Sequence, residues 1–365
     1  MTERIIPVLM PKWGLSMKEG KLTGWLIEDG KPINVGEAIL EVETDKIAGS
    51  VESTEAGVLR RRVGQADTIY PVKALLGVIA DPSVPDSEID AYVASYVLPP
   101  PEEGEDEAGP SYEFADVDGA SLRYAKRGDG AETVLLIHGF GGDLDNWLFN
   151  IDALAEGATV YALDLPGHGQ SAKAIGDASV AGLAKTVLAF MDKVGIKNAH
   201  LVGHSLGGAI AMQVAATAKG RVKSLTLISS AGLGAEINHG YISGFTGAAS
   251  RRDIKPVLEQ LFADPSLVSR QMIDDILKYK RLDGVAGALT ALAEGVFPGG
   301  RQKTILNPGD VPTLVLWGKE DKIVPAAHAA NAKGAKVETL EGAGHMVQME
   351  QANKVNASIK SHIGG

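Results

Sequence analysis

A run of acidic residues and prolines divides this chain into two parts that must fold separately. Residues 81–118 contain twelve Asp or Glu and no Lys or Arg, and three prolines at 99–101 directly precede the acidic run 102–107. Such a segment cannot bury an apolar core, and proline stiffness and charge repulsion extend it. We therefore predict an acidic, proline-containing linker over residues 81–113.

The lengths on either side of this linker suit one small and one larger domain. The chain has 365 residues, and we assign 1–80 to the first domain and 114–365 to the second. A linker of about 30 residues reaches roughly 30 Å as a flexible coil. Within it, one short helix is expected near residues 87–97.

Charge and cysteine content exclude several classes of protein. The net charge of −11 argues against nucleic-acid binding. Residues 81–118 contribute −12 and the rest of the chain about +1, so the acidity belongs to this one segment. The absence of cysteine excludes disulfides, thiolate metal sites and a cysteine nucleophile. The N-terminus lacks a signal-peptide pattern, and no run approaches the ~20 apolar residues that span a bilayer. We expect a soluble cytoplasmic protein that uses neither a membrane nor a metal ion.

The first domain has the pattern of a small antiparallel β fold. Short alternating apolar runs, such as 21–27 and 38–43, are separated by Gly and Asp, and no helical periodicity is evident. Residues 42–44 would lead into a turn at Asp45-Lys46, and 47–51 would lead away from it. A hairpin tip would expose Lys46 and hold it in a fixed position, as a carrier lysine requires.

Two segments of this domain resemble the lipoyl domains of 2-oxo acid and acetoin dehydrogenase complexes. They are Met-Pro-Lys-Trp-Gly-Leu-Ser-Met-Lys-Glu-Gly at 10–20 and Glu-Thr-Asp-Lys-Ile at 43–47. The resemblance covers residues 3–80 and implies that Lys46 carries lipoate in amide linkage. Related biotin carriers place Met on both sides of their lysine, whereas here the neighbours are Asp45 and Ile47. Lipoate is therefore favoured over biotin, and it would supply the redox and thioester chemistry.

The second domain reads as an α/β fold with a mostly parallel sheet. Buried-strand runs at 133–137, 159–163 and 225–228 alternate with segments of helix length, including 181–194 and 208–218. A stretch from about 232 to 303 breaks this rhythm and has three helical segments of its own. They are 254–262, 269–279 and 285–293. We predict that this stretch forms a helical cap over the sheet.

A serine between a strand and a helix is the candidate nucleophile. Gly203-His204-Ser205-Leu206-Gly207 follows an apolar run and precedes a helical one. Strand, sharp turn and helix make a nucleophile elbow, in which small flanking residues permit a strained backbone at the serine. Serine needs a base, and the base needs an orienting carboxylate.

The acid and the base follow in the order Ser, acid, His that this fold requires. Asp321 comes after the apolar strand 313–316, and His345 lies in Gly-Ala-Gly-His-Met near the C-terminus. Both positions match those of the α/β-hydrolase family, which residues 115–363 resemble. The plain alternatives are that Asp321 caps a helix and that His345 is an ordinary loop residue.

The same resemblance implies the remaining parts of the site. Two backbone N–H groups should form an oxyanion hole, one from Leu206 and one from Phe140 in His-Gly-Phe-Gly-Gly. His138 and His204 lie near the chemistry in sequence, but structural roles are expected for them. His168 belongs to a block, residues 164–171, that forms a structural turn in this family.

Together the two parts resemble the acetyltransferase components of acetoin dehydrogenase systems, some of which join a lipoyl domain to an α/β-hydrolase-like domain. The resemblance implies that a thiamine-diphosphate-dependent component acylates the arm on Lys46, and that Ser205 passes the acetyl group to coenzyme A. A flavin-dependent dihydrolipoyl dehydrogenase would reoxidise the arm, and a lipoate-attaching enzyme would modify Lys46. The chain lacks the His-x-x-x-Asp-Gly motif of the usual trimeric acyltransferase domain and a recognisable subunit-binding module.

A triad alone does not choose between coenzyme A and water as acceptor. A serine esterase or thioesterase is therefore the alternative enzyme, and a lipoyl carrier with a non-catalytic hydrolase-like domain is a third hypothesis. Basic residues of the cap would either contact the phosphates of coenzyme A or serve as solvated helix-face charges. They are Arg251, Arg252, Lys278, Lys280 and Arg281.

Overall fold

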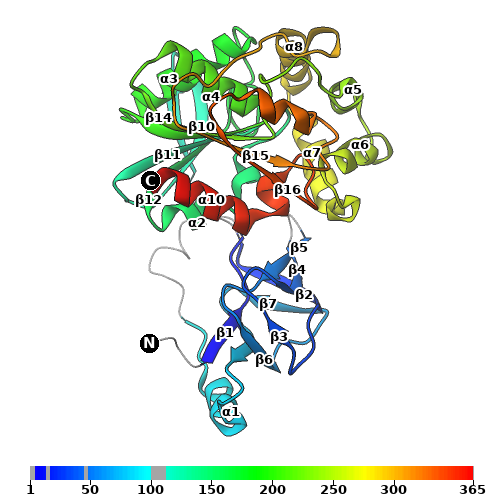
Figure 1. Ribbon diagram of the computed structural model, residues 1–365. Helices are drawn as coiled ribbons and strands as arrows, with labels where there is room; N and C mark the ends of the chain where they lie inside the picture. Colours follow the sequence, from blue (N-terminus) through cyan, green and yellow to red (C-terminus); the bar gives the residue numbers. More distant parts are fainter. Residues whose placement is uncertain (1–4, 14–16, 45–47, 100–111, 365) are drawn as a thin grey trace. The chain divides into compact units, whose positions relative to one another are not determined.

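The chain forms two compact units, Met1–Pro110 and Ser111–Gly365. The computed structural model describes residues 5–13, 17–44, 48–99 and 112–364. Figure 1 shows the course of the chain through both units.

The first unit is built from two four-stranded antiparallel sheets. Their strand orders are β1-β8-β6-β3 and β5-β4-β2-β7. The eight strands are β1 Ile5–Leu9, β2 Glu19–Trp25, β3 Pro32–Ile33, β4 Ala38–Glu43, β5 Ala48–Glu52, β6 Gly57–Arg62, β7 Thr68–Pro71 and β8 Leu75–Ala80. Their inward-facing side chains meet in one core that includes the fully buried Leu22, Leu40 and Leu59. The predicted small β domain is confirmed.

Strands β4 and β5 form the antiparallel pair that the sequence predicted on either side of the carrier lysine. Their register pairs Glu43 with Ala48, so residues 44–47 connect the two strands. Lys46 itself lies outside the described residues.

The short helix expected after residue 80 is present as α1, Asp86–Ser95, and it packs against β8 within the first unit. Its buried Ile89 joins Val78 and Val84 in a small apolar cluster. Arg60 on β6 pairs with Asp86 at 2.8 Å, which adds an ion pair at the start of the helix. The beginning of the acidic segment is therefore held by apolar and ionic contacts, which composition alone did not indicate.

The second unit contains an eight-stranded sheet of order β16-β15-β14-β13-β11-β12-β10-β9. Its strands are β9 Tyr112–Val117, β10 Ala120–Arg127, β11 Glu132–Ile137, β12 Ala158–Leu163, β13 Ala199–His204, β14 Val222–Ile228, β15 Thr313–Gly318 and β16 Lys336–Leu340. Strands β9 and β10 pair antiparallel, and β10 pairs antiparallel with β12. The remaining pairs are parallel, which confirms the predicted mostly parallel sheet. All six residues of β13 and of β15 are buried, as expected for strands covered on both faces.

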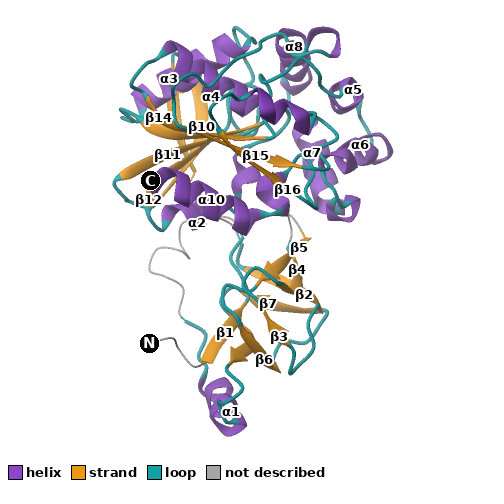
Figure 2. Ribbon diagram, in the orientation of Figure 1, coloured by secondary structure: helices purple, strands orange, loops and turns teal. Residues whose placement is uncertain are grey.

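Helices cover both faces of this sheet, with α3 and α4 on one side and α2 and α10 on the other (Figure 2). The helices outside the cap are η1 Leu144–Trp147, α2 Ile151–Ala155, α3 Val180–Lys193, α4 Leu206–Thr217, η5 Ala326–Asn331, α9 Val347–Glu350 and α10 Ala352–Gly364. Within the described ranges, no helix has both the length and the apolar character that would let it cross a bilayer.

The chain between β14 and β15 forms the predicted cap, whose helices gather at one side of the unit in Figure 1. They are α5 His239–Gly247, α6 Arg251–Leu258, η2 Glu259–Leu261, η3 Pro265–Leu267, α7 Arg270–Lys280, α8 Val285–Val296 and η4 Pro298–Gly300. Ser250 and Ser269 cap the starts of α6 and α7 by accepting backbone N–H bonds, which explains why these helices begin where they do. The parallel strands β11, β13, β14 and β15 all end at one edge of the sheet, where ligands bind in open α/β folds.

Candidate active site

The backbone at Ser205 has the strained conformation of a nucleophile elbow. Its φ and ψ are 52° and −118°, at the junction of β13 and α4. The strain is held by backbone bonds, because its N–H donates to Ile228 at 2.9 Å and its carbonyl accepts from Ala231 at 2.9 Å. A Cβ at Gly203 would lie 2.4 Å from the carbonyl oxygen of Gly207. Glycine is therefore required for the close approach of strand and helix beside the serine.

His345 and Asp321 form a buried hydrogen-bonded pair. Nδ1 of His345 lies 2.9 Å from Oδ2 of Asp321, and both side chains are nearly fully buried. Since a carboxylate only accepts, Nδ1 carries the proton and Nε2 is left as a base. The other oxygen of Asp321 accepts from the N–H groups of Ile323 and Val324. Asp321 thus caps the following turn and orients the imidazole, so the two interpretations of this residue are compatible.

His204 joins the elbow to the loop that carries His345. Its Nε2 donates to the backbone oxygen of His345 at 2.9 Å, and the two rings lie 4.8 Å apart. Burial, reinforced by the nearby His345, holds the pKa of His204 well below its ordinary value. His204 is therefore a neutral donor. Because it directly precedes Ser205, its hydrogen bond holds the loop of His345 beside the nucleophile elbow.

His138 and His168 use both ring nitrogens on the backbone of neighbouring turns. Nε2 of His138 accepts from Leu165 at 3.0 Å, and Nε2 of His168 accepts from Gly141 at 3.1 Å. Each Nδ1 faces a backbone carbonyl oxygen. Burial lowers the pKa of both histidines, and their rings pack edge to face 4.9 Å apart. Their hydrogen bonds shape the turn that contains Phe140.

Two backbone N–H groups are available for an oxyanion hole. Leu206 is the first residue of α4, so its N–H has no partner within the helix. Across the described ranges, no backbone hydrogen bond uses the N–H of Phe140. Phe140 follows Gly139, which lies directly against the elbow. A Cβ at Gly139 would be 2.9 Å from Cβ of Ser205.

A buried ion pair supports the turns behind the site. Nε of Arg123 lies 2.6 Å from Oδ2 of Asp164, and both side chains are almost entirely excluded from solvent. Asp164 also accepts from the N–H groups of Leu144 and Gln170, each at 2.8 Å. One carboxylate therefore holds the start of η1 and the 164–171 turn together.

Glu350, which the sequence analysis did not single out, lies between the loop of His345 and the cap. Its two carboxylate oxygens accept from the N–H groups of Ala263 and Gly344, each at 2.7 Å. Burial raises the pKa of Glu350 to about 7, against the lowering effect of these two hydrogen bonds. No sequence motif marks this residue, and the only available signal was a carboxylate shortly after the candidate base.

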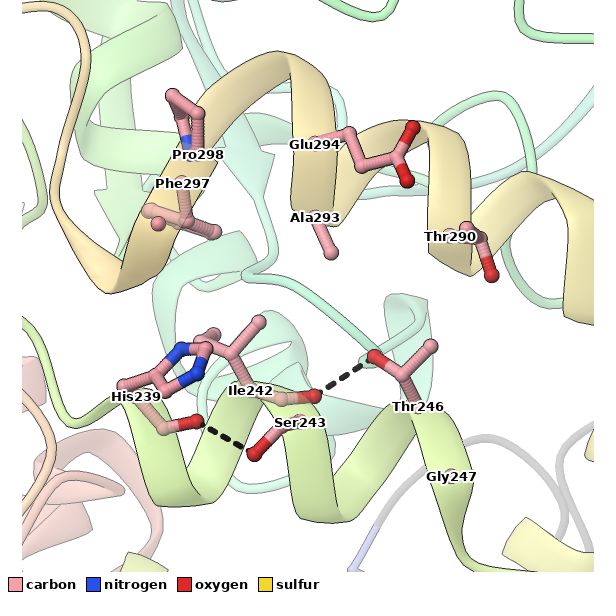
Figure 3. Close-up of a pocket in the computed structure, with 11 residues that line it drawn as sticks. His239, Ile242, Ser243, Thr246, Gly247, Thr290, Ala293, Glu294, Phe297 and Pro298 are labelled. Carbon is pink, nitrogen blue, oxygen red and sulfur yellow. Dashed lines mark hydrogen bonds between the residues drawn. The ribbon is translucent and has the colours of Figure 1, made fainter.

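An open cleft of about 340 Å³ lies between cap helices α5 and α8 (Figure 3). Ile242 and Thr246 line it from α5, Ala293 lines it from α8, and Phe297 lines it from the position directly after α8. Ser243 and Thr246 donate their hydroxyl protons to carbonyls of their own helix, so their oxygens are left as acceptors.

One wall of this cleft reaches the proposed oxyanion hole. The ring of Phe297 packs edge to face against Phe140 at 6.1 Å, and Phe140 meets Phe245 at 5.9 Å. All three rings are buried. This aromatic cluster links the lining of the cleft to the turn that contains Phe140, and sequence patterns did not reveal it.

Two basic residues of the cap make internal contacts. Arg251 forms a two-pronged pair with Asp274, at 2.5 and 2.6 Å. Lys280 donates to the backbone oxygens of Phe245 and Thr246 at the end of α5, and burial lowers its pKa. Two arginines of the described cap form ion pairs, Arg251 and Arg252. Of these two, Arg252 has the side chain that is almost fully exposed. Phosphate binding by Arg251 or Lys280 would require breaking these contacts.

Lys46, which the sequence predicts as the lipoate-carrying residue, lies outside the described residues. In the part of the chain that the structure describes, no group of three or more His, Asp or Glu side chains is arranged to hold a metal ion.

Known families match both units. Residues 132–352 match the α/β hydrolase fold family, and residues 6–72 match the family described as biotin-requiring enzymes. Among solved structures, a meta-cleavage product hydrolase from Pseudomonas fluorescens has a TM-score of 0.62 at 24% identity, covering 69% of this chain and 97% of that chain. At this level of identity the likeness concerns the fold alone.

Two curated proteins are similar to the chain over nearly its whole length. The dihydrolipoyllysine-residue acetyltransferase component of the acetoin cleaving system of Cupriavidus necator is 57% identical, over 99% of this chain and 98% of that protein. The component of the same name from Pseudomonas putida is 51% identical, over 99% of each.

Proposed function

Since this chain belongs to the family of dihydrolipoyllysine-residue acetyltransferase components of acetoin cleaving systems, we propose that it moves an acetyl group from a lipoyl arm to coenzyme A through Ser205. The observation that carries this proposal is the His345–Asp321 hydrogen bond of 2.9 Å on a loop tied to the nucleophile elbow. Lipoate bound in amide linkage to Lys46 supplies the thiol that carries the acetyl group.

The first half of the reaction acylates the enzyme. Nε2 of His345 takes the proton of Ser205 while Oγ attacks the thioester carbonyl carbon. The N–H groups of Phe140 and Leu206 stabilise the oxyanion that forms. The carbon–sulfur bond then breaks, His345 gives its proton to the leaving sulfur, and acetyl-Ser205 remains.

The second half transfers the acetyl group to the acceptor. His345 removes the thiol proton of coenzyme A, whose sulfur attacks the acetyl-serine carbonyl. The same two N–H groups stabilise the second oxyanion, and the serine oxygen leaves with the proton held by His345. Acetyl-CoA and free Ser205 are the products.

Burial of the site supports transfer over hydrolysis. Ser205 is 5% exposed and His345 is 2% exposed, so an acetyl-serine would be shielded from bulk water. An esterase or thioesterase that hydrolyses acyl esters or lipoyl thioesters is the alternative. A carrier with a non-catalytic hydrolase-like unit would require the His345–Asp321 pair to have no chemical role.

The cleft between α5 and α8 is the place we propose for the acylated arm. A lipoyl arm is a slender, uncharged alkyl amide, and 340 Å³ is near the lower limit for small-molecule sites. Of its lining residues only Glu294 carries a carboxylate, which would repel the phosphates of coenzyme A. Phe297 of the cleft lining packs against Phe140, whose N–H is proposed for the oxyanion hole.

The wider context of the reaction follows from the same family membership. A thiamine-diphosphate-dependent component would acylate the arm, and a flavin-dependent dihydrolipoyl dehydrogenase would reoxidise it. A lipoate-attaching enzyme would modify Lys46, and the cytoplasm would hold all of these partners.

Trapping the intermediate tests the proposal. The chain is incubated with S-acetyl-dihydrolipoamide in the absence of coenzyme A and then digested. One acetyl group should be found on the peptide containing Ser205, and none after Ser205→Ala. Intact mass after expression with lipoate should show modification at Lys46, and Lys46→Ala should abolish it. Acetyl groups spread over other residues, or lipoate elsewhere, would contradict the assignment.

A further inference from the structure

The cap and the loop carrying His345 are joined by a set of short hydrogen bonds. The carbonyl oxygen of Leu261, at the end of η2, accepts from the N–H groups of both His345 and Met346, at 2.8 and 3.1 Å. Two residues further along the cap, Ala263 donates to Glu350, which also accepts from Gly344. Glu350 thus bridges the cap and the residue directly before the base.

The packing at this junction leaves no space for adjustment. A Cβ at Gly344 would lie 2.7 Å from the backbone nitrogen of Ala263 and 2.9 Å from the oxygen of Leu261. Both neighbours are backbone atoms, which cannot rotate away as a side chain can. The position of His345 is therefore set by the cap as well as by Asp321.

We propose that Glu350 is a positioning residue for catalysis, whose carboxylate fastens the His345 loop to the cap and thereby fixes the imidazole against Ser205. This inference rests on the proposed function only in taking His345 as the base, and it goes beyond it by assigning a role to a residue outside the triad. Glu350 touches neither substrate nor the reacting atoms and acts through Gly344.

The bridge needs an ionised carboxylate. Two N–H groups point at its two oxygens, and a protonated acid would present a donor to one of them. Burial raises the pKa of Glu350 to about 7, so the bridge forms as the pH rises through neutrality. The charged groups that act on it are His345, which lowers this pKa, and Asp321, which raises it. On the cap side, the carboxylate of Asp264 is occupied by the N–H of Ser266.

The test compares Glu350→Gln with a second carboxylate that accepts a hydrogen bond from the same loop. Glu320 accepts from Ala343 at 3.1 Å, is exposed, and lies outside the bridge to the cap, so Glu320→Gln is the control. The readout is the pre-steady-state burst with an activated acetate ester, which reports acylation of Ser205 without needing coenzyme A. Glu350→Gln should slow the burst about 10- to 100-fold, as expected for a misplaced catalytic group. Glu320→Gln should stay within about threefold of the unmodified chain.

Two further readouts separate positioning from a loss of folded protein. The rise of the burst rate between about pH 6 and 8 should become shallower in Glu350→Gln, since the ionisation of Glu350 near pH 7 is removed. The far-downfield proton resonance of the His345–Asp321 hydrogen bond should shift or broaden in this variant and remain unchanged in Glu320→Gln.

A second variant keeps the proposal open to refutation if Glu350→Gln does not fold. Gly344→Ala inserts a methyl group between the loop and the cap, and it should reproduce the slower burst and the altered resonance. If the folded variants acylate as fast as the unmodified chain, with the same pH profile and the same resonance, the proposal is overturned. Loss of the acetyl-CoA product with an unchanged burst would instead contradict the proposed transfer function alone.

Discussion

His204 donates a hydrogen bond from Nε2 to the backbone oxygen of His345, a residue 141 positions away, at 2.9 Å. This bond fixes the distance between the strand that ends at the nucleophile and the loop that carries the base. The loop is therefore held on two sides, by His204 from the sheet and by Glu350, which is itself bound to Ala263 of the cap.

Replacing His204 tests the first of these supports. His204→Phe fills a similar volume but leaves the oxygen of His345 buried without a donor, which should cost about 1–3 kcal/mol in the free energy of unfolding. The rate constant kcat should fall while KM stays nearly constant, because only the base is displaced. Urea unfolding and steady-state kinetics measure both effects. An unchanged kcat in a destabilised variant would show that the bond is purely structural.

Stability should fall in mild acid because of the buried histidines. Burial lowers the folded pKa of His138, His168 and His204, so as the pH falls below about 6.5 the unfolded chain takes up as many as three protons that the folded chain does not yet bind. Glu350, whose pKa is raised to about 7, binds one proton only in the folded state. The difference of about two protons predicts a loss of up to about 2.7 kcal/mol for each pH unit lost.

Urea midpoints measured below about pH 6.5 give the slope directly. His168→Phe should reduce the slope by about 1.4 kcal/mol per pH unit, because it removes one of the three protons. A free energy of unfolding that is flat, or that increases toward pH 5, would contradict the burial of these neutral rings.

The buried Arg123–Asp164 pair should be sensitive to the loss of one partner. Arg123→Leu leaves the Asp164 carboxylate buried without its cation, and we expect a loss of about 3–5 kcal/mol. The exposed pair between Lys360 and Glu156 is the control, and Lys360→Ala should cost at most about 1 kcal/mol. Equal losses in the two variants, measured by urea unfolding, would contradict the stabilising role assigned to the buried pair.

Filling the cleft between α5 and α8 should affect one substrate and not the other. Ala293→Phe places a ring in the cleft and should raise KM for S-acetyl-dihydrolipoamide about tenfold or more, with KM for coenzyme A within about twofold. Ala286→Phe, on an exposed position of α8 outside the cleft lining, is the control. A raised KM for coenzyme A instead would assign the cleft to the acceptor.

Local signals in the sequence were sufficient to predict most elements of the fold. Strand 38–43 was expected and is present with the same limits, and the cap helix expected at 269–279 runs from Arg270 to Lys280. Turn-forming residues and serine N-caps allow the ends of these elements to be predicted to within a few residues. The order of Ser205, Asp321 and His345 was also readable, because the fold family fixes it.

Contacts between distant segments could not be predicted from local patterns. Glu350 meets Ala263 across 87 positions, and the rings of Phe245 and Phe297 reach Phe140 only when the cap has packed. The position of α1 depends on apolar side chains of β8. The composition of the acidic segment gave no sign of this contact. These contacts form only when complete helices and strands pack together. Patterns among neighbouring residues in the sequence therefore do not predict them.

The most direct test of acetyl transfer follows one turnover of the lipoylated, acetylated chain with and without coenzyme A. We predict that coenzyme A is converted to acetyl-CoA in the amount of acetyl group loaded, that little acetate appears without it, and that Ser205→Ala abolishes the transfer. Release of free acetate at the same rate whether or not coenzyme A is present would contradict the account and identify the site as a hydrolase.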